Sequence, residues 1–442
     1  MSIRYQLLGV ALIVASVFLV PSGYGFYISI LALLMCMVTY RWVTLGVYLL
    51  LFGPQTFGFI ADKFDYAGWG GPAIVFVGLF ILNRRYPLLK VFNECPHGIG
   101  LLFWCTCVLS FFYVYGLQNS YAVYLLVEFI KTGFLSFVGF YFIFRDKSVN
   151  WQGLGLMGII SGLIYLSVAA MIDPMILPRS ILDIGRLHFS TFSDIGLRVN
   201  VTFFNHLVAY LPVVGYMFLY SRDTRQSLNE KEKIIWFASL FAVTVLVGWS
   251  GARQGLFSLM IGMLSIFLVS GKLRNGRYFI WVIVGCFLCA GVLLMAILKD
   301  MAMYTVLVDA KASILTKINR GENFNSSWWL LQKKPFLGHG LGGYYIPGYS
   351  KPGDQVFAHN VILDLLAQTG LIGTLSFFLP ILLFRTFRER IVLTRNLVFG
   401  NSIMPVFVVI VLRLLLDVHL GDIGILIGMI AAMRPDRDES EQ

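Results

Sequence analysis

The chain has 442 residues, of which 58% are hydrophobic and only 13% are charged, and its mean hydropathy is +0.79. Soluble domains are close to half apolar and about a quarter charged, so the composition excludes a soluble globular protein. The formal net charge is +11. Most basic residues lie in short segments between apolar runs, a pattern typical of membrane proteins and not of nucleic-acid-binding proteins.

Apolar runs of about 15–24 residues recur along the chain, close to the length at which a helix crosses the hydrocarbon layer. Backbone amides in a bilayer must be paired within their own segment, so these runs predict helices. The predicted spans are residues 5–20, 24–40, 43–60, 72–83, 97–116, 121–144, 152–172, 202–220, 234–249, 255–270, 278–298, 361–384, 397–415 and 420–433. The sequence thus predicts an all-α polytopic membrane protein with about 12–14 transmembrane helices. We expect one membrane domain over residues 1–442, with the first span retained and not cleaved.

Basic residues also predict the orientation in the membrane. Six segments holding most of them fall on one face if every span is real: residues 83–85, 145–147, 221–233, 271–277, 385–395 and the tail after 433. By the positive-inside rule this face is cytoplasmic, with both termini inside. The opposite face then carries two large periplasmic loops, residues 173–201 and 299–360. Loops of this length are usually functional.

Arg253 stands in a tight turn, residues 250–255, between two apolar runs. A charge at the membrane boundary is costly and tends to mark a ligand or a partner. The planar guanidinium fits a phosphate or carboxylate in a bidentate way, so an anionic ligand is one interpretation. A structural ion pair with Asp417 or Asp422 is the other.

A polar pair, His359 and Asn360, stands where the second large loop re-enters the membrane, and Asp364 follows about a helical turn later. Helical spacing allows the Asp364 carboxylate to approach and orient the His359 imidazole. A histidine at a helix start can also be a cap or an interfacial residue, and these residues alone do not decide between the two interpretations.

Several other polar or aromatic residues favour a structural role. Glu128 and Lys131 lie one turn apart in a predicted span and are expected to pair with each other. His339 is expected to be a packing or hydrogen-bonding residue. Trp328 and Trp329 suit either the membrane interface, which we favour, or stacking on sugars.

Four signals occur in order between residues 198 and 373. They are Arg198 with the asparagines up to Asn205, the turn from Ser250 to Arg253, Arg320 with Trp328 and the glycine run 338–342, and His359-Asn360 with Gly370 and Gly373. In order and spacing this set resembles the O-antigen ligase and polymerase superfamily, membrane glycosyltransferases that act on polyprenyl-diphosphate-linked glycans. The first 170 residues match that family only in being hydrophobic.

The resemblance implies a set of site residues. They are Arg198, Arg253, Arg320 and His359, which stand where the family carries its essential arginine and histidine residues. We expect His359 and Arg253 to be catalytic, and Arg198, Arg320, Asn205 and Asn360 to bind the diphosphate or substrate. Asp364 and Asp417 are expected, from their own positions in the sequence, to orient other groups. The turn departs from the family pattern, because two residues separate Ser250 from Arg253 where many members have serine directly before arginine. This departure puts Ser250 in doubt but not Arg253.

The residues suit transfer of a sugar that is already activated by a lipid diphosphate. Fixed arginines can stabilise the negative charge that develops on the departing diphosphate, with no metal or cofactor. His359 can take the proton from the acceptor hydroxyl, or can only hold a phosphate by hydrogen bonding. One base and no nucleophile predict a single displacement with inversion. A metal at Asp417, His419 and Asp422 is a less favoured alternative to a polar turn.

The sequence thus predicts a glycosyltransferase of a bacterial inner membrane with its site facing the periplasm. We favour an O-antigen polymerase over an O-antigen ligase; a flippase or transporter and a non-catalytic scaffold are more distant alternatives. The expected partners are a polyprenyl-diphosphate-linked glycan, an acceptor glycan or lipid A-core, membrane lipids and a chain-length regulator protein, with no nucleic acid.

Overall fold

The computed structural model describes residues 24–39, 42–51, 70–85, 87–116, 118–145, 320–343, 360–383 and 420–433, together with positions 12, 149, 154, 157, 160, 163, 164, 410, 411, 414 and 415. Regular structure in these ranges is helical, and no strand occurs in them. Five predicted site residues lie outside the described residues: Arg198, Asn205, Arg253, His359 and Asp417. The first large loop, residues 173–201, also lies outside them.

Three described helices are long and apolar enough to cross a bilayer: α8 (Pro96–Tyr115), α9 (Ser120–Arg145) and α16 (Val361–Leu383). They begin and end within about two residues of spans predicted from hydropathy, which is the usual uncertainty of helix ends. The predicted all-α membrane fold is therefore confirmed. The total of about 12–14 spans stays a prediction.

The described helices belong to two compact units. The first contains α2 (Tyr24–Thr39), α3 (Trp42–Leu51) and α6 (Gly70–Arg85). Here α3 and α6 pack so closely that a Cβ atom added to Gly46 would lie 2.8 Å from Cγ of Leu82. Small residues at helix crossings allow such close packing in membranes.

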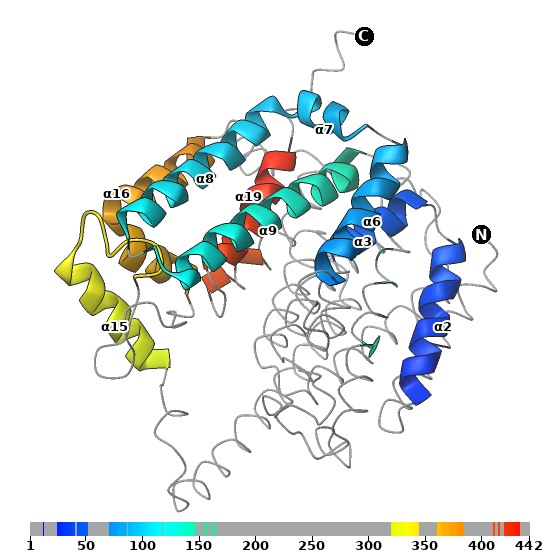
Figure 1. The fold of residues 1–442 in the computed structure, drawn as a ribbon, viewed down its shortest axis with the longest axis horizontal. Coiled ribbons are helices and arrows are strands. Elements are labelled where there is room, and N and C mark those ends of the chain that lie inside the picture. Colours follow the sequence, from blue (N-terminus) through cyan, green and yellow to red (C-terminus); the bar gives the residue numbers. More distant parts are fainter. Residues whose placement is uncertain are drawn as a thin grey trace, which may run out of the picture. The chain divides into compact units, whose positions relative to one another are not determined.

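The second unit contains α8, α9 and α16 together with α7 (Leu88–Glu94), α15 (Arg320–Lys333), the short 3₁₀ helix η6 (Leu420–Asp422) and α19 (Ile423–Ala432). In Figure 1, α9 and the red α19 lie side by side. Glycines at one or two turns' spacing make their contact close, namely Gly421, Gly424 and Gly428. Two helices of this unit, α7 and α15, were not predicted from the sequence.

Contacts between the helices show which of their ends lie together. The first turn of α8 abuts the end of α19, because a Cβ on Gly98 would overlap the carbonyl of Ala431. Further along α8, the Trp104 indole Nε1 donates to the Ser376 carbonyl of α16 at 2.9 Å. The end of α8 is followed by a turn into α9. Residues 335–343 are hydrogen-bonded to the same end of α8 and to this turn.

Candidate functional site

Two described segments carry the predicted site residues. Arg320 is the first residue of α15, and Asn360 immediately precedes α16. His359 is the neighbour of Asn360 in the chain, so the structure of the α16 start determines where the His359 segment is attached. Helices α15 and α16 pack against each other.

Asn360 caps α16. Its side-chain Oδ1 accepts hydrogen bonds from the backbone N–H groups of Ile362 at 3.0 Å and Leu363 at 3.1 Å. Its Nδ2 donates to the carbonyl of Leu415 at 3.1 Å. The side chain thus satisfies two backbone donors that a helix start leaves unpaired and ties the start to a separate segment. Its predicted role in binding substrate stays a prediction.

The two functions of the Asn360 amide can be separated by substitution. Asn360→Ala removes both the cap and the bond to Leu415, and we expect it to cost about 0.5–2 kcal/mol of stability. Asn360→Asp keeps the capping oxygen but replaces the donor to Leu415 with a carboxylate oxygen, which cannot bond to that carbonyl. The thermal midpoint of the detergent-solubilised protein should therefore fall more for alanine than for aspartate. Equal midpoints in the two variants would contradict the capping role.

Polar side chains line the buried face of the first half of α16. Asp364, Gln368 and Thr369 are fully buried, at helical spacings of four and one. Buried polar groups in a membrane span are costly and mark sites with a specific role. The second half of α16 has only Thr374 and Ser376 as polar side chains, so the larger polar groups lie between Asn360 and the break in the helix at Gly370. The predicted orienting role of Asp364 stays a prediction.

Helix α16 is broken at Gly370, whose backbone has φ 64° and ψ −171°. An unbroken helix would bond the N–H groups of Leu371 and Ile372 to the carbonyls of Ala367 and Gln368. Here all four groups pair with a segment that we call the glycine loop, residues 335–343. A break in an apolar helix of a membrane protein is tolerated only where such partners exist.

The glycine loop and the break exchange four backbone hydrogen bonds. Leu371 and Ile372 donate to the carbonyls of Pro335 and Phe336 at 2.8 and 3.0 Å. His339 and Gly340 of the loop donate in return to the carbonyls of Ala367 and Gln368, at 3.1 and 2.8 Å. The Gln368 side chain adds a fifth bond, because its Oε1 accepts from the Gly342 N–H at 2.7 Å. The loop therefore locks the end of α15 to the middle of α16.

The glycine loop also binds the turn between α8 and α9. The Leu341 N–H donates to the Phe112 carbonyl at 2.9 Å, and the Asn119 Nδ2 donates to the Gly342 carbonyl at 3.0 Å. Gly340 has φ 84°, and a Cβ atom there would overlap Gly116. Three helices of the unit are thus held together by one loop that glycine allows to approach them closely.

His339 lies in the glycine loop, and its Nε2 is 3.0 Å from the carbonyl of Leu330 in α15. Partial burial lowers the pKa of His339 from its ordinary value; the hydrogen bond to Leu330 opposes this shift, and the neighbouring Lys334 adds to it. The hydrogen bond to a carbonyl requires a proton on Nε2, which the neutral ring can supply. The predicted hydrogen-bonding role of His339 is confirmed.

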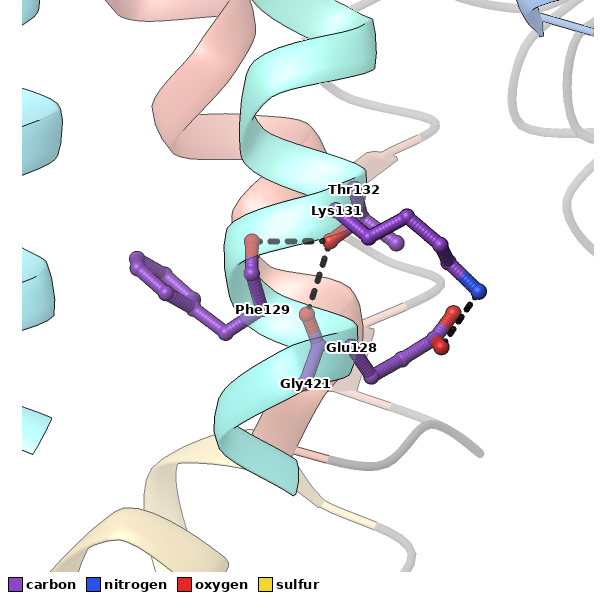
Figure 2. Close-up of polar contacts among 5 residues, drawn as sticks. All are labelled: Glu128, Phe129, Lys131, Thr132 and Gly421. Atoms are coloured by element: carbon purple, nitrogen blue, oxygen red, sulfur yellow. Dashed lines mark hydrogen bonds and ion pairs between the residues drawn. The ribbon is translucent and has the colours of Figure 1, made fainter. Parts of the chain in front are cut away.

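Glu128 and Lys131 form the ion pair predicted from their spacing, with Nζ and Oε2 2.5 Å apart (Figure 2). The Lys131 side chain is 51% exposed and that of Glu128 20%. On the neighbouring turn of α9, the Thr132 hydroxyl donates to the Gly421 carbonyl at 3.0 Å and so fixes η6 against α9. The pair therefore lies beside η6, whose final residue Asp422 directly precedes α19.

The turn before α19 was the alternative place for a metal. Of its three ligand-type residues, the structure describes only Asp422, which belongs to η6. Within the described part of the chain there is no group of three histidine, cysteine or acidic side chains that could hold a metal ion. Asp417 and His419 lie outside that part, so a metal at this turn stays a less favoured prediction.

Comparison with known proteins bears directly on these segments. Residues 237–378 match a family model described as O-antigen ligase. The chain carries an O-antigen ligase family domain. No curated protein and no solved structure matches the chain. The predicted resemblance is thereby confirmed for residues 237–378, and the protein is a multi-pass membrane protein.

The matched residues include most of the helices and the loop described above. The match includes the whole of α15, the glycine loop and α16 as far as Phe378. Of the predicted site residues, it includes Arg253, Arg320, His359, Asn360 and Asp364. The other three precede or follow it: Arg198, Asn205 and Asp417.

Proposed function

We propose that the protein is a membrane glycosyltransferase that transfers an oligosaccharide from a polyprenyl diphosphate to an acceptor sugar hydroxyl. The observation that carries the proposal is the O-antigen ligase domain over residues 237–378, in which Arg253, Arg320 and His359 all lie. We place the enzyme in a bacterial inner membrane, with its site facing the periplasm and both termini in the cytoplasm, because of the distribution of basic loops.

In the proposed reaction the acceptor oxygen attacks the anomeric carbon while the bond from that carbon to the diphosphate oxygen breaks. His359 takes the proton of the acceptor hydroxyl, and the leaving diphosphate keeps the electron pair of the broken bond. Arg253 and Arg320, with Arg198, stabilise the negative charge that grows on the diphosphate. A single displacement of this kind inverts the configuration at the anomeric carbon.

The described geometry supports this proposal through the way it attaches the site segments. Arg320 starts a helix whose far end is locked to α16 by the glycine loop, and His359 adjoins the Asn360 cap of that same α16. Electrostatic stabilisation is effective when the charged groups are held in place before the reaction. The helix that begins at Arg320 and the helix that begins beside His359 are thus joined by one hydrogen-bonded loop.

Two acceptors are compatible with this chemistry. An O-antigen polymerase would transfer the glycan to another lipid-linked glycan, and the large predicted number of spans favours it. An O-antigen ligase would transfer the glycan to lipid A-core, and the description of the matched family favours that alternative. We propose the polymerase as the leading function, with a chain-length regulator protein as a further partner.

One reconstitution distinguishes the candidates. Purified protein in vesicles is supplied with polyprenyl-diphosphate oligosaccharide, with and without lipid A-core, and the products are separated by size. Longer lipid-linked glycans without the core acceptor would support a polymerase, and a glycosylated core formed only with the acceptor would support a ligase. Movement of the donor between leaflets without any new glycosidic bond would overturn both and favour a flippase.

A further inference from the structure

Large apolar side chains, most of them aromatic, are exposed near the end of α15 and at the start of the glycine loop. We call Trp328, Trp329, Phe336 and Leu337 the aromatic platform. Trp328 is 51% and Phe336 65% exposed, whereas Leu330 and Leu331 between them in the chain are buried. An apolar surface of this kind on one side of a short helix usually marks a contact with a partner or a membrane.

Hydrogen bonds place the aromatic platform at the level where two membrane spans end. The glycine loop is bonded to Phe112 in the last turn of α8 and to Asn119 just before α9. The 20 residues of α8 rise by about 30 Å, which matches the hydrocarbon thickness of a bilayer. The turn between α8 and α9 therefore lies at the membrane boundary, and so do the glycine loop and the break at Gly370 to which the loop is bonded. The part of α16 before Gly370 then extends beyond the hydrocarbon on this side. The platform, attached to the glycine loop, lies close to the same boundary.

Two cations accompany the aromatic rings. Lys333 and Lys334 are both exposed, and Nζ of Lys333 lies 5.5 Å from the ring centroid of Trp329. The only acidic residue in the sequence of α15 is Glu322, at the opposite end of the helix. Tryptophan with lysine is the combination enriched where a membrane meets water, because the ring is amphipathic and the ammonium group can reach the phosphates.

We propose that the aromatic platform lies in the headgroup layer of the membrane, on the side of the turn between α8 and α9. The rings lie below the phosphates, and Lys333 and Lys334 contact the phosphate groups of anionic phospholipids. The 14-residue helix α15 therefore lies on the membrane surface and does not project into the aqueous phase. If the proposed function holds, this position of α15 keeps Arg320 in the headgroup layer, which also contains the diphosphate of the donor.

Quenching of tryptophan fluorescence by brominated phospholipid tests this proposal without reference to catalysis. The full chain is reconstituted in vesicles whose acyl chains carry bromine either near the headgroup or near the chain end. The emission lost in Trp328→Phe or in Trp329→Phe reports one ring at a time. We expect bromine near the headgroup to quench these rings about twofold more than bromine near the chain end, as for interfacial tryptophan.

Trp104 is the matched control, because it is also 50% exposed but lies within α8, where its indole binds Ser376. We expect the emission lost in Trp104→Phe to show the opposite depth preference. The combined change of Lys333→Gln and Lys334→Gln should weaken quenching of the platform in anionic vesicles and not in neutral ones. If neither bromine position quenches Trp328 or Trp329 while Trp104 is quenched, the platform lies in water and the proposal is wrong. A change of the platform emission on adding free oligosaccharide would then support stacking on sugars.

Discussion

Replacing His359 with alanine should lower the rate of glycan transfer by about 10²–10⁴-fold, the range that a positioned general base contributes. Binding of the donor should change little, because the proposed contacts to the diphosphate come from arginines. We therefore expect kcat to fall far more than KM rises, as for an interaction made only in the transition state. The rate is measured on vesicles that contain the full chain, the lipid-linked donor and an acceptor in excess.

His97 provides the matched control, since it is an exposed histidine in the first turn of α8, at the opposite end of that helix from the glycine loop. His97→Ala should transfer glycan at the rate of the unchanged protein. His359→Gln separates the two roles left open for this residue, because glutamine can donate a hydrogen bond to a phosphate but cannot accept a proton at neutral pH. Activity retained in glutamine would indicate a phosphate-binding histidine, and full activity in His359→Ala would overturn both roles.

Arg253→Lys distinguishes a fork of donors from a simple charge. Lysine keeps the positive charge but cannot bind a phosphate in a bidentate way. A loss of rate with lysine similar to that with alanine would therefore support bidentate contact with the diphosphate. If both variants instead lower the yield of folded protein and leave the rate unchanged, Arg253 would have a structural role. That result would support the alternative ion pair with Asp417 or Asp422.

Hydropathy predicts α8, α9 and α16 closely because the requirement that creates them is local. Each must bury its own backbone hydrogen bonds and present apolar side chains along its whole length, and both properties are visible within one window of sequence. The Glu128–Lys131 ion pair is predictable for the same reason, since its partners are neighbours on one helix face.

Helix α15 was not predicted because its stability does not come from its own sequence. It has 14 residues, includes a glycine and two serines, and apart from Phe324 its large apolar residues are confined to positions 328–331. A helix this short is marginal by itself and depends on packing. The packing comes from α16, and in particular from the loop that joins α15 to the break at Gly370.

The break in α16 was also beyond sequence reasoning. Gly370 and Gly373 lie three residues apart in one apolar run, and a glycine there only lowers helix propensity. The glycine at 370 departs from helical geometry because a segment distant in sequence supplies carbonyls for Leu371 and Ile372. The sequence offers one signal, the glycine run 338–343, which lies before a span that also contains glycines. This run resembles a family motif, but it does not indicate that Gly370 is the site to which it bonds.

Gly370→Ala should destabilise the protein by about 2–6 kcal/mol. A backbone with φ 64° and ψ −171° is accessible almost only to glycine, so forcing alanine into it costs about 1–3 kcal/mol. The added Cβ would also overlap the Phe336 carbonyl, and overpacking of this kind costs about 1–3 kcal/mol more. Thermal unfolding of the detergent-solubilised protein, followed by size-exclusion chromatography, measures the loss.

Gly100→Ala is the matched control, because Gly100 lies in α8 with nothing within 4 Å of its added Cβ. Alanine is the better helix former, so this variant should be as stable as the unchanged protein or more stable. A second test uses the reciprocal contact: a Cβ on Gly338 would lie 2.6 Å from the Gly370 N. If the loop and the break form a single contact, Gly338→Ala alone already disrupts most of it. The double variant should then lose less unfolding free energy than the sum of the losses in the two single variants. Additive losses would mean that the two glycines act independently, and the lock between α15 and α16 would then not exist in the membrane.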